Sequence, residues 1–275
     1  MSDKKRQMWQ DLDMDLETHD MLLDALPGLY EKIYLSQSNR PEGMGFYDLV
    51  VSDIHGIRPK ELVDAKKAGN KIIGAFCVYV PEEIVLALDA ILVGLCGGTE
   101  FSMPAAEEYL PRNLCALIKS SLGFKVQKTC AYYQVCDLII GETTCEGKKK
   151  MFEILEEHTP MYVIQMPPKP DQANSKEFWL QEMKNLIVKL EEITGNELTA
   201  EKLKEGIRLV NEKRTALQRI AETRKEHPPP ISGKDALLVT QVAFYDDVAR
   251  ATQKATELYE ELQDRIKNGV SGVDP

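Results

Sequence analysis

Short apolar segments alternate with helix-like segments through the middle of the chain. The apolar segments, which predict β-strands, cover residues 46–51, 71–80, 90–95, 137–140 and 161–165. Helical patterns lie between them at residues 59–68, 81–89, 107–122 and 151–157, with Gly123 as a stop after the third. Because a repeated strand, helix, strand order favours parallel pairing through right-handed crossovers, this pattern predicts a doubly wound α/β domain with a parallel sheet.

The two ends of the chain show helical patterns without strands. Leucine and isoleucine recur at helical spacing over residues 8–35, with Pro27 as a kink or break, which predicts an amphipathic helical cover. Beyond a proline-rich stretch that begins at residue 167, helices are predicted at residues 175–193, 199–226 and 233–267, with Thr199 as an N-cap. The predicted parts are therefore a helical cover (1–45), an α/β domain (46–167) and a helical region (168–275).

The charge balance and the hydropathy narrow the class of protein. The formal net charge is −10, from 34 basic and 44 acidic residues, which disfavours nucleic acid or an anionic membrane as the partner. No apolar stretch is long enough to cross a bilayer, and the N-terminus lacks the apolar core of a signal peptide. We therefore expect a cytoplasmic protein.

The cysteines are concentrated in one part of the chain. All six lie between residues 77 and 145, and they are Cys77, Cys96, Cys115, Cys130, Cys136 and Cys145. In a cytosolic chain of this length a disulfide framework is not expected. Cysteine is often a small buried apolar residue, but six of them in loops and at strand ends of one segment favour a metal site.

The stretch around Cys145 has the pattern of a βα unit. An apolar run ends at Gly141, a polar turn carries Cys145, and a helical pattern follows residues 146–150. This order predicts that Cys145 lies at the carboxyl end of a parallel strand, where α/β sheets bind ligands. Close to the positive end of the next helix, the thiol is expected to have a lowered pKa, and thiolate is the form that binds metal.

Two familiar kinds of site fit these residues poorly. Structural zinc sites favour paired cysteines such as Cys-x2-Cys, which are absent, and the four histidines are mostly far from the cysteine-bearing loops. A P-loop requires four residues between its glycines, but five separate Gly141 from Gly147, and Lys149 stands where Ser or Thr should bind magnesium. We interpret residues 148–150 as a solvated helix face or a docking patch for an acidic partner.

An iron-sulfur cluster is the third alternative. Cysteines from several loops at one edge of a sheet can converge on a cluster without a compact sequence signature. The glycines Gly97 and Gly98 would allow the backbone to approach inorganic sulfide closely.

Three stretches then resemble one known family. GETTCEGKKKM (141–151) resembles the GE-x-TCDGKKKM signature of the 2-hydroxyacyl-CoA dehydratase and benzoyl-CoA reductase superfamily. FCVYVPEEIVLALDA (76–90) resembles its P-x-E-L-x-x-A segment, and residues 95–124 resemble its LP-x-N-x-C-x-x-x-KSS region. The resemblance runs from about residue 47 to residue 166.

The resemblance implies a fold, a cofactor and a partner. Family members pair two flavodoxin-like α/β domains with a helical region, and they hold a low-potential [4Fe-4S] cluster that an ATP-hydrolysing iron-sulfur activator protein reduces. On that pattern Cys115 and Cys145 would be cluster ligands. The further matches at Cys96, Cys130 and Cys77 resemble the branch with a double-cubane [8Fe-9S] cluster, which reduces small molecules where its relatives dehydrate acyl-CoA thioesters.

The resemblance also implies one-electron chemistry. In the dehydratases, an electron from the cluster makes a ketyl radical of the thioester carbonyl and so permits elimination of water. Glu83 matches the acidic position after the proline of the family's motif and would handle a proton, with Glu82 as its rival. Both residues also suit a helix N-terminus, where acidic side chains are favourable without any catalytic role.

The sequence departs from the family pattern in two respects. Cys136 stands where relatives carry another residue, so we expect it to be a core residue. The second α/β domain, which supplies at least one more cluster cysteine, would begin where this sequence stops. We therefore expect either the N-terminal part of a longer protein or ligands from another chain, in a homodimer or in a heterodimer with a related subunit. A cluster-free structural or regulatory module, with inert buried cysteines, is the alternative.

Overall fold

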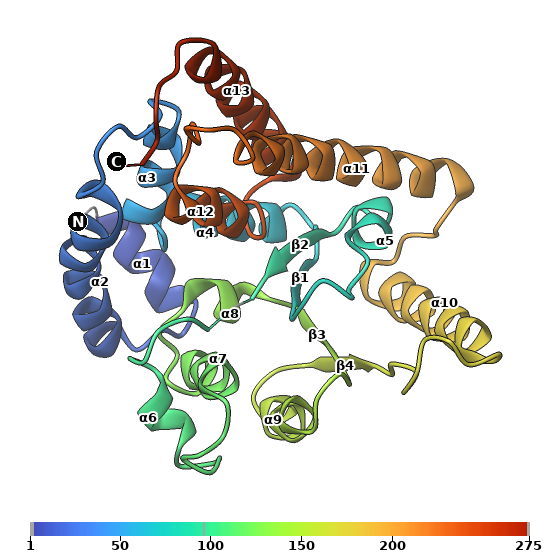
Figure 1. The fold of residues 1–275 in the computed structure, drawn as a ribbon. Coiled ribbons are helices and arrows are strands. Elements are labelled where there is room, and N and C mark those ends of the chain that lie inside the picture. Colours follow the sequence, from blue (N-terminus) through green and yellow to red (C-terminus); the bar gives the residue numbers. More distant parts are fainter. Residues whose placement is uncertain (1–2, 96, 274–275) are drawn as a thin grey trace. The chain divides into compact units, whose positions relative to one another are not determined.

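The computed structural model describes residues 3–95 and 97–273 and divides into two compact units. The α/β unit comprises Met1–Asp20 and Pro59–Gly206, and the helical unit comprises Met21–Arg58 and Ile207–Pro275 (Figure 1). Among the described residues, no helix combines the length and the apolar character that a membrane crossing needs.

Four parallel strands form the sheet of the α/β unit. They are β1 (Ile72–Ala75), β2 (Ile91–Gly94), β3 (Leu138–Glu142) and β4 (Met161–Ile164), in the spatial order β2-β1-β3-β4. In the register, Ile73 pairs with both Leu92 and Leu138. This is the order of the first four strands of flavodoxin-like sheets, so the predicted doubly wound α/β fold is confirmed. The order reverses between β1 and β3.

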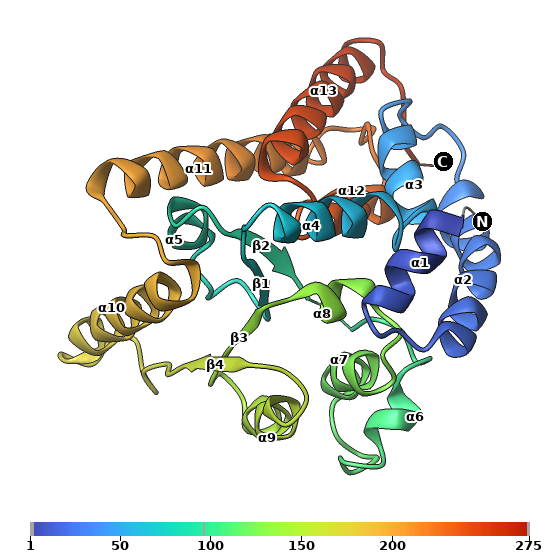
Figure 2. The same cartoon turned by 180° about the vertical axis from the view of Figure 1, so that it is seen from behind.

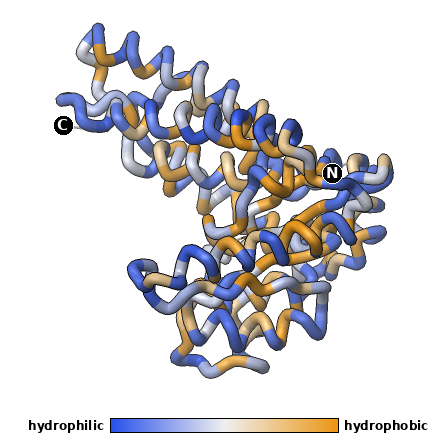
Figure 3. The backbone as a smooth tube through the Cα atoms, turned by 90° about the vertical axis from the view of Figure 1, so that its right-hand side faces the viewer, coloured by the Kyte–Doolittle hydropathy of each residue, from blue (hydrophilic) through white to orange (hydrophobic). Residues whose placement is uncertain are grey.

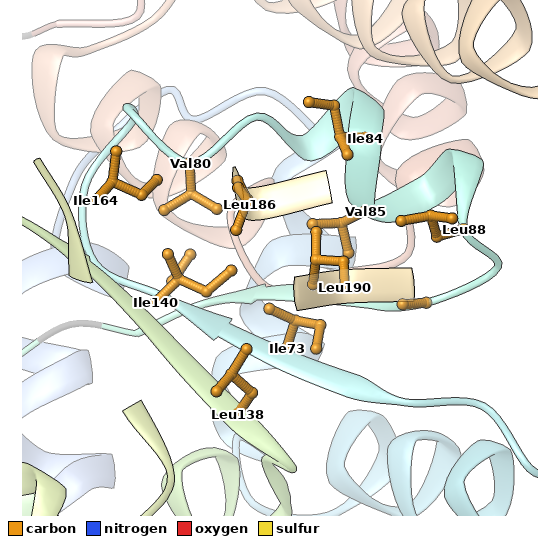
Figure 4. Packing of buried hydrophobic residues seen from close by; sticks show 12 residues of the cluster. Ile73, Val80, Ile84, Val85, Leu88, Leu138, Ile140, Ile164, Leu186 and Leu190 are labelled. Carbon is orange, nitrogen blue, oxygen red and sulfur yellow. The ribbon is translucent and has the colours of Figure 1, made fainter. Parts of the chain in front are cut away.

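Helices cover both faces of this sheet (Figures 1 and 2). The helices of the α/β unit outside its boundary segments are α1 (Asp3–Asp11), α5 (Glu82–Ala87), α6 (Met103–Ala106), α7 (Ala116–Val126), α8 (Ala131–Val135), α9 (Glu146–Glu156) and α10 (Ser175–Thr194). Alternate strand residues point to opposite faces. Ile73 and Ile140 pack with Leu186 of α10 on one face (Figure 4). On the other face Phe152 of α9 packs so closely that a Cβ on Gly141 would lie 2.4 Å from its ring.

The helical unit has its own core. It contains α3 (Met44–Ser52), α12 (Gly233–Val242), α13 (Val248–Lys267), a π-helix (Glu31–Leu35) and parts of α2 (Leu16–Tyr30) and α11 (Ala200–Thr223). Apolar side chains at helical spacing face the core, so α11 and α13 alternate in hydropathy along their length (Figure 3). Arg40 joins distant segments, because it pairs with Asp48 at 2.8 Å and with the buried Asp235 at 3.0 Å.

The first predicted strand is wrong, because residues 46–51 lie in the helix α3. Met44 and Tyr47, three residues apart, are buried in the helical core, whereas Leu49 is 55% exposed. A six-residue apolar run fits a buried strand and a helix equally well, and packing decides between them.

The predicted helix at residues 107–122 is also wrong in its limits. A loop that contains Pro111 separates α6 from α7. A proline ring does not fit a helix interior, so a continuous helix cannot pass through this position undisturbed. Gly123 lies inside α7 and not after it. Glycine is needed there because a Cβ would lie 1.9 Å from the Ser102 carbonyl oxygen. The short helix α8, over Ala131–Val135, is absent from the predicted elements.

Other boundaries differ less. Pro27 lies within α2, and residues 233–267 form two helices, α12 and α13, where one was predicted. Thr199 caps α11 as predicted, because its Oγ1 accepts a hydrogen bond from Lys202 N at 3.2 Å. The division of the chain at residues 45 and 167 stays a prediction.

Candidate functional site

Two cysteines follow the two strands between which the strand order reverses. β1 and β3 are neighbours in the sheet, and Cys77 follows β1 while Cys145 follows β3. Phe76 N still donates to Ile140 O at 2.9 Å, so β1 and β3 stay joined up to the residue before Cys77. In open α/β sheets the carboxyl ends of such strands form the ligand crevice. The structure therefore places both cysteines at this edge of the sheet. This position was expected for Cys145, whereas Cys77 was predicted within a strand over residues 71–80 and in fact follows β1, which ends at Ala75.

Cys77 has an unusual backbone conformation. Its φ is +67°, in the left-handed region that residues with a Cβ rarely adopt, and its side chain is exposed. The preceding Phe76 is buried, with its ring 5.6 Å from that of Phe152 and 6.1 Å from that of Tyr133. The positive φ of Cys77 stores backbone strain of the kind that collects at functional sites.

Cys145 caps the helix α9. Its backbone is extended, its thiol is exposed, and Sγ accepts a hydrogen bond from Lys148 N at 3.4 Å. The turn before it is held in place, because Thr143 Oγ1 accepts a hydrogen bond from Met166 N at 2.8 Å. Cys145 is thus presented by a hydrogen-bonded turn at the N-terminus of an eleven-residue helix.

A buried ion pair lies beside these two thiols. Glu142, the last residue of β3, is wholly buried; it accepts a hydrogen bond from Thr144 N at 2.8 Å and pairs with Lys148 Nζ. Burial lowers the pKa of Lys148, but the hydrogen bond and charge of Glu142 outweigh burial, and charges on Cys77 and Cys145 raise the pKa further. The Lys148 cation therefore lies within electrostatic reach of both thiols.

This pair corrects the interpretation of residues 148–150 as a solvated face. Lys149 and Lys150 fit that interpretation, since Lys149 is partly exposed, Lys150 is exposed, and each pairs at 2.7 Å with a glutamate of its own helix. The Lys148 side chain is only 20% exposed and belongs to the site. The sequence feature that could have indicated this buried ion pair is a single acidic residue, Glu142, at the end of an apolar run.

Cys115 lies close to the same turn. It is exposed and immediately precedes α7. A Cβ on Gly147 would lie 3.1 Å from Leu114 Cδ1 and 3.8 Å from Cys145 Sγ. The start of α7 therefore packs against the start of α9, and the absence of a side chain at Gly147 permits this approach.

The residues Lys119 and Ser120 of α7 fix the loops around the site. Lys119 is buried, and its Nζ lies 2.7 Å from both Glu107 Oε1 and the Arg112 carbonyl oxygen. The hydrogen bond from Lys119 holds the pKa of Glu107 below its usual value. Ser120 Oγ accepts a hydrogen bond from Gly98 N at 3.0 Å, which joins the loop after β2 to α7. Cys96, in that loop, lies outside the described residues.

Cys130 and Cys136 have different surroundings from the exposed thiols. Both are buried, and they lie immediately before and after α8. Cys136 Sγ donates to the Tyr132 carbonyl oxygen at 3.1 Å, and burial raises the pKa of Cys136 to about 12. Cys136 is therefore a core thiol, in keeping with its expected role, and Cys130 is the one described candidate ligand that is buried.

Glu83 lies in the first turn of α5, which begins beyond the loop that carries Cys77. Glu82 and Glu83 are both half-buried. The main chain of Glu83 lies directly against α11, where Gly206 faces its carbonyl oxygen. The catalytic role of Glu83 stays a prediction.

Thiols are the ligands that iron-sulfur clusters need, and the exposed thiols of the described residues lie at the ligand edge of the sheet. Each comes from a different loop. Cys77, Cys115 and Cys145 come from three loops at one edge of the sheet. Within residues 3–95 and 97–273, no three side chains of the His, Cys, Asp and Glu types gather as a metal-binding group. The donor type suits iron, and the described residues do not form a finished ligand set.

The structure thus defines an α/β protein with a flavodoxin-like sheet and exposed thiols at the carboxyl edge of that sheet. The model of one family, described as 2-hydroxyglutaryl-CoA dehydratase, D-component, matches residues 77–275. The chain belongs to this family, and the resemblance to the 2-hydroxyacyl-CoA dehydratase and benzoyl-CoA reductase superfamily is confirmed.

Curated relatives agree with this assignment. A putative dehydratase subunit YjiM of Escherichia coli is 39% identical over 184 residues, covering 67% of this chain and 48% of that protein. The (R)-phenyllactyl-CoA dehydratase beta subunit of Clostridium sporogenes is 27% identical, with 72% of this chain and 53% of that protein covered. The (R)-2-hydroxyglutaryl-CoA dehydratase subunit beta of Acidaminococcus fermentans is also 27% identical, with 74% and 54% covered. The chain spans about half the length of the curated relatives it matches.

Proposed function

We propose that this chain is an iron-sulfur component that carries out low-potential, one-electron reduction of a small molecule. The observation that carries the proposal is the position of two exposed thiols, Cys77 and Cys145, after two adjacent parallel strands at the ligand edge of the sheet. Cys115 is the third exposed candidate ligand, and Cys96 and Cys130 are further ones. When bound, a [4Fe-4S] or double-cubane [8Fe-9S] cluster supplies single electrons at low potential.

The chain's own residues would prepare the site for such a cluster. Thiolates placed close together repel one another, and a cation within reach of both reduces that repulsion. Lys148 has this position, and the buried Glu142 holds it there. Below the thiols, the packed rings of Phe76 and Phe152 keep water out of the sheet. Glu83 would hold the proton that a reduced substrate takes up.

The proposal includes partners. Two of the relatives are named as beta subunits, which supports assembly with a related subunit or with a second copy of the chain. An ATP-hydrolysing iron-sulfur activator protein would deliver the electron. Cys77, Cys115, Cys136 and Cys145 are in the thiol form, which suits the reducing cytoplasm.

The test is the content of iron and acid-labile sulfide per chain in protein purified and reconstituted without oxygen. About eight irons per chain support a double cubane, and about four support a single [4Fe-4S] cluster. The visible spectrum, taken on the same sample, should show the broad absorption of an iron-sulfur protein. A colourless protein without iron overturns the proposal and favours a cluster-free module.

The names of the relatives favour a second candidate, a 2-hydroxyacyl-CoA dehydratase subunit that removes water from an acyl-CoA thioester. This candidate predicts about four irons per chain. It also predicts turnover of a 2-hydroxyacyl-CoA only when an activator protein and ATP are present. A reduced, iron-loaded protein that leaves such thioesters unchanged in a complete assay contradicts it.

A further inference from the structure

The helix α11 contains a glycine where another residue would fit a helix better. Gly206 lies seven residues into this 24-residue helix, and glycine is among the least favourable residues in a helix interior. A Cβ on Gly206 would lie 2.3 Å from the Glu83 carbonyl oxygen and 3.4 Å from Glu83 Cα. Real Cβ atoms essentially never approach within 3.0 Å. Only glycine at this position allows α11 to contact the first turn of α5.

Two polar contacts join the same segment to the other end of α5. Lys202, one helical turn before Gly206, pairs through its Nζ with Asp89 Oδ2 at 2.9 Å. Asn196 Nδ2 donates to the Leu88 carbonyl oxygen at 2.9 Å. The segment from residue 196 to residue 206 therefore contacts α5 at its start and just beyond its end.

Apolar packing completes the contact. Leu203, between Lys202 and Gly206, packs against a buried cluster. That cluster includes Val85 and Leu88 of the α5 region (Figure 4). All these residues belong to the α/β unit. Helix α5 is therefore held along its whole length, although it has only six residues.

The position of α5 determines where the loop that carries Cys77 ends. That loop starts at the buried Phe76 and reaches Pro81, whose carbonyl oxygen accepts hydrogen bonds from Ile84 N at 3.1 Å and Val85 N at 3.4 Å. Val78 is 70% exposed, so the middle of the loop has little packing of its own. The two ends of the loop, one on β1 and one on α5, are what hold it.

We propose that Gly206 is a positioning residue for the candidate site, through its close contact with the main chain of Glu83. It allows α11 to hold the start of α5, and α5 in turn holds the loop of Cys77 and the carboxyl group of Glu83. The part of this inference that concerns cluster properties rests on the proposed function. The part that concerns the loop is independent of it.

The test compares Gly206→Ala with Lys204→Ala in the full chain. Lys204 is exposed on the same helix, so its replacement changes helix propensity without adding a contact. In Gly206→Ala the added methyl group must displace the Glu83 main chain. We expect amide hydrogen exchange at Ile84 and Val85, and in the loop of Cys77, to quicken by about tenfold or more, with no change in Lys204→Ala. Equal exchange rates in Gly206→Ala and the parent would overturn the inference.

A second variant distinguishes a local effect at this contact from a general loss of structure. Lys202→Met removes the ion pair to Asp89 without adding volume at the contact, and it should quicken exchange in the same residues by about threefold or more. Exchange in β3 and β4 serves as the internal reference and should not change in either variant. If exchange rises equally across the sheet, the contact has a general structural role and the inference is wrong.

A spectroscopic measurement tests the link to the site. In the iron-loaded protein, Gly206→Ala should shift the midpoint potential or the electron paramagnetic resonance spectrum of the cluster, while Lys204→Ala leaves both unchanged. Parent protein that binds no iron refutes the proposed function, and the exchange rates then decide the positioning role alone. Iron-loaded variants with parental potential, spectrum and exchange refute the positioning role and leave the proposed function standing.

Discussion

Among single residues, Lys148 differs from the two lysines that follow it by the burial of its partner. Lys149 and Lys150 pair with exposed glutamates, whereas Lys148 pairs with the wholly buried Glu142. Removing one member of a buried pair leaves the other charge without compensation, which costs far more than the loss of a surface pair. The position of each lysine along α9 therefore determines how much its removal should lower the free energy of unfolding.

The expected consequence is a large difference between two similar variants. Lys148→Met should lower the free energy of unfolding of the metal-free protein by roughly 2 to 4 kcal/mol. The control Lys149→Met should change it by less than about 0.5 kcal/mol. Chemical denaturation followed by circular dichroism measures both. Equal stabilities would show that Glu142 finds another partner or takes up a proton.

Cys145 can be tested by a substitution that keeps its capping role. Serine is a good N-cap residue, so Cys145→Ser should leave α9 intact while it removes the thiol. We expect lower iron content and weaker low-potential redox activity, with the helical circular dichroism signal unchanged. Iron content equal to that of the parent would remove Cys145 from the proposed site.

Cys136 should behave in the opposite way. Its thiol is buried against Gly74, and its pKa is raised to about 12 by burial, so it is neutral at physiological pH. Cys136→Ala should cost about 1 kcal/mol or somewhat more as a small truncation of the core. Its iron content should equal that of the parent. A loss of iron in this variant would show that Cys136 is a ligand.

At the level of secondary structure, the helix α13 depends on one capping side chain. Asp247 Oδ1 accepts hydrogen bonds from Ala249 N at 3.1 Å and Arg250 N at 3.0 Å, which satisfies two of the free amides at the helix start. Asp247→Ala should lower the free energy of unfolding by about 1 kcal/mol, and Asp247→Asn by less. Thermal unfolding of the two variants measures this, and equal losses for both would argue against capping as the cause.

The strands of the sheet were predictable because each is a short apolar run followed by a turn or a helix signal. Each of the four strands lies within or beside a predicted segment, and the capping position of Cys145 agrees with the expected βα unit. The segment 46–51 has the same apolar character and yet forms a helix. This segment is helical because of its packing in the helical core, which the local sequence pattern does not reveal.

The sequence provided the candidate cysteines, whose role as ligands stays a prediction, but not the contacts of the residues around them. Strand order places Cys77 and Cys145 at the same edge of the sheet, and motif resemblance indicated Cys115 as a candidate ligand. The pairing of Glu142 with Lys148 depends on how the turn between them folds, and the contact of Gly206 with Glu83 joins residues far apart in the sequence. Such contacts arise from tertiary packing, so no local pattern indicates them.

In the whole molecule, the chain passes between its two compact units at three places, residues 20–21, 58–59 and 206–207. Each of these lies inside a helix, α2, α4 (Ile57–Lys67) and α11 respectively. Proline-rich or glycine-rich linkers, which mark domain boundaries in many sequences, are absent at all three. The two units are thus built from interleaved segments joined by continuous helices.

His19 ties the stability of the folded chain to pH. Its side chain is wholly buried, and burial lowers its pKa to about 4, against an opposing effect of Asp20 and a further lowering by Arg6. In the unfolded chain a histidine has a pKa near 6.5. Between about pH 6.5 and pH 4 the unfolded chain therefore binds a proton that the folded chain does not, and folding becomes less favourable as the pH falls.

The expected size of this effect follows from the difference between the two pKa values. It amounts to about 3 kcal/mol lost between pH 7 and pH 4, and His19 adds no pH dependence above about pH 7. Carboxyl groups titrate in the same range, so the measurement is the difference in slope between variants. In His19→Leu the free energy of unfolding should fall less steeply from pH 7 to pH 4 than in the parent. Parallel curves for parent and His19→Leu would show that His19 takes up its proton without unfolding.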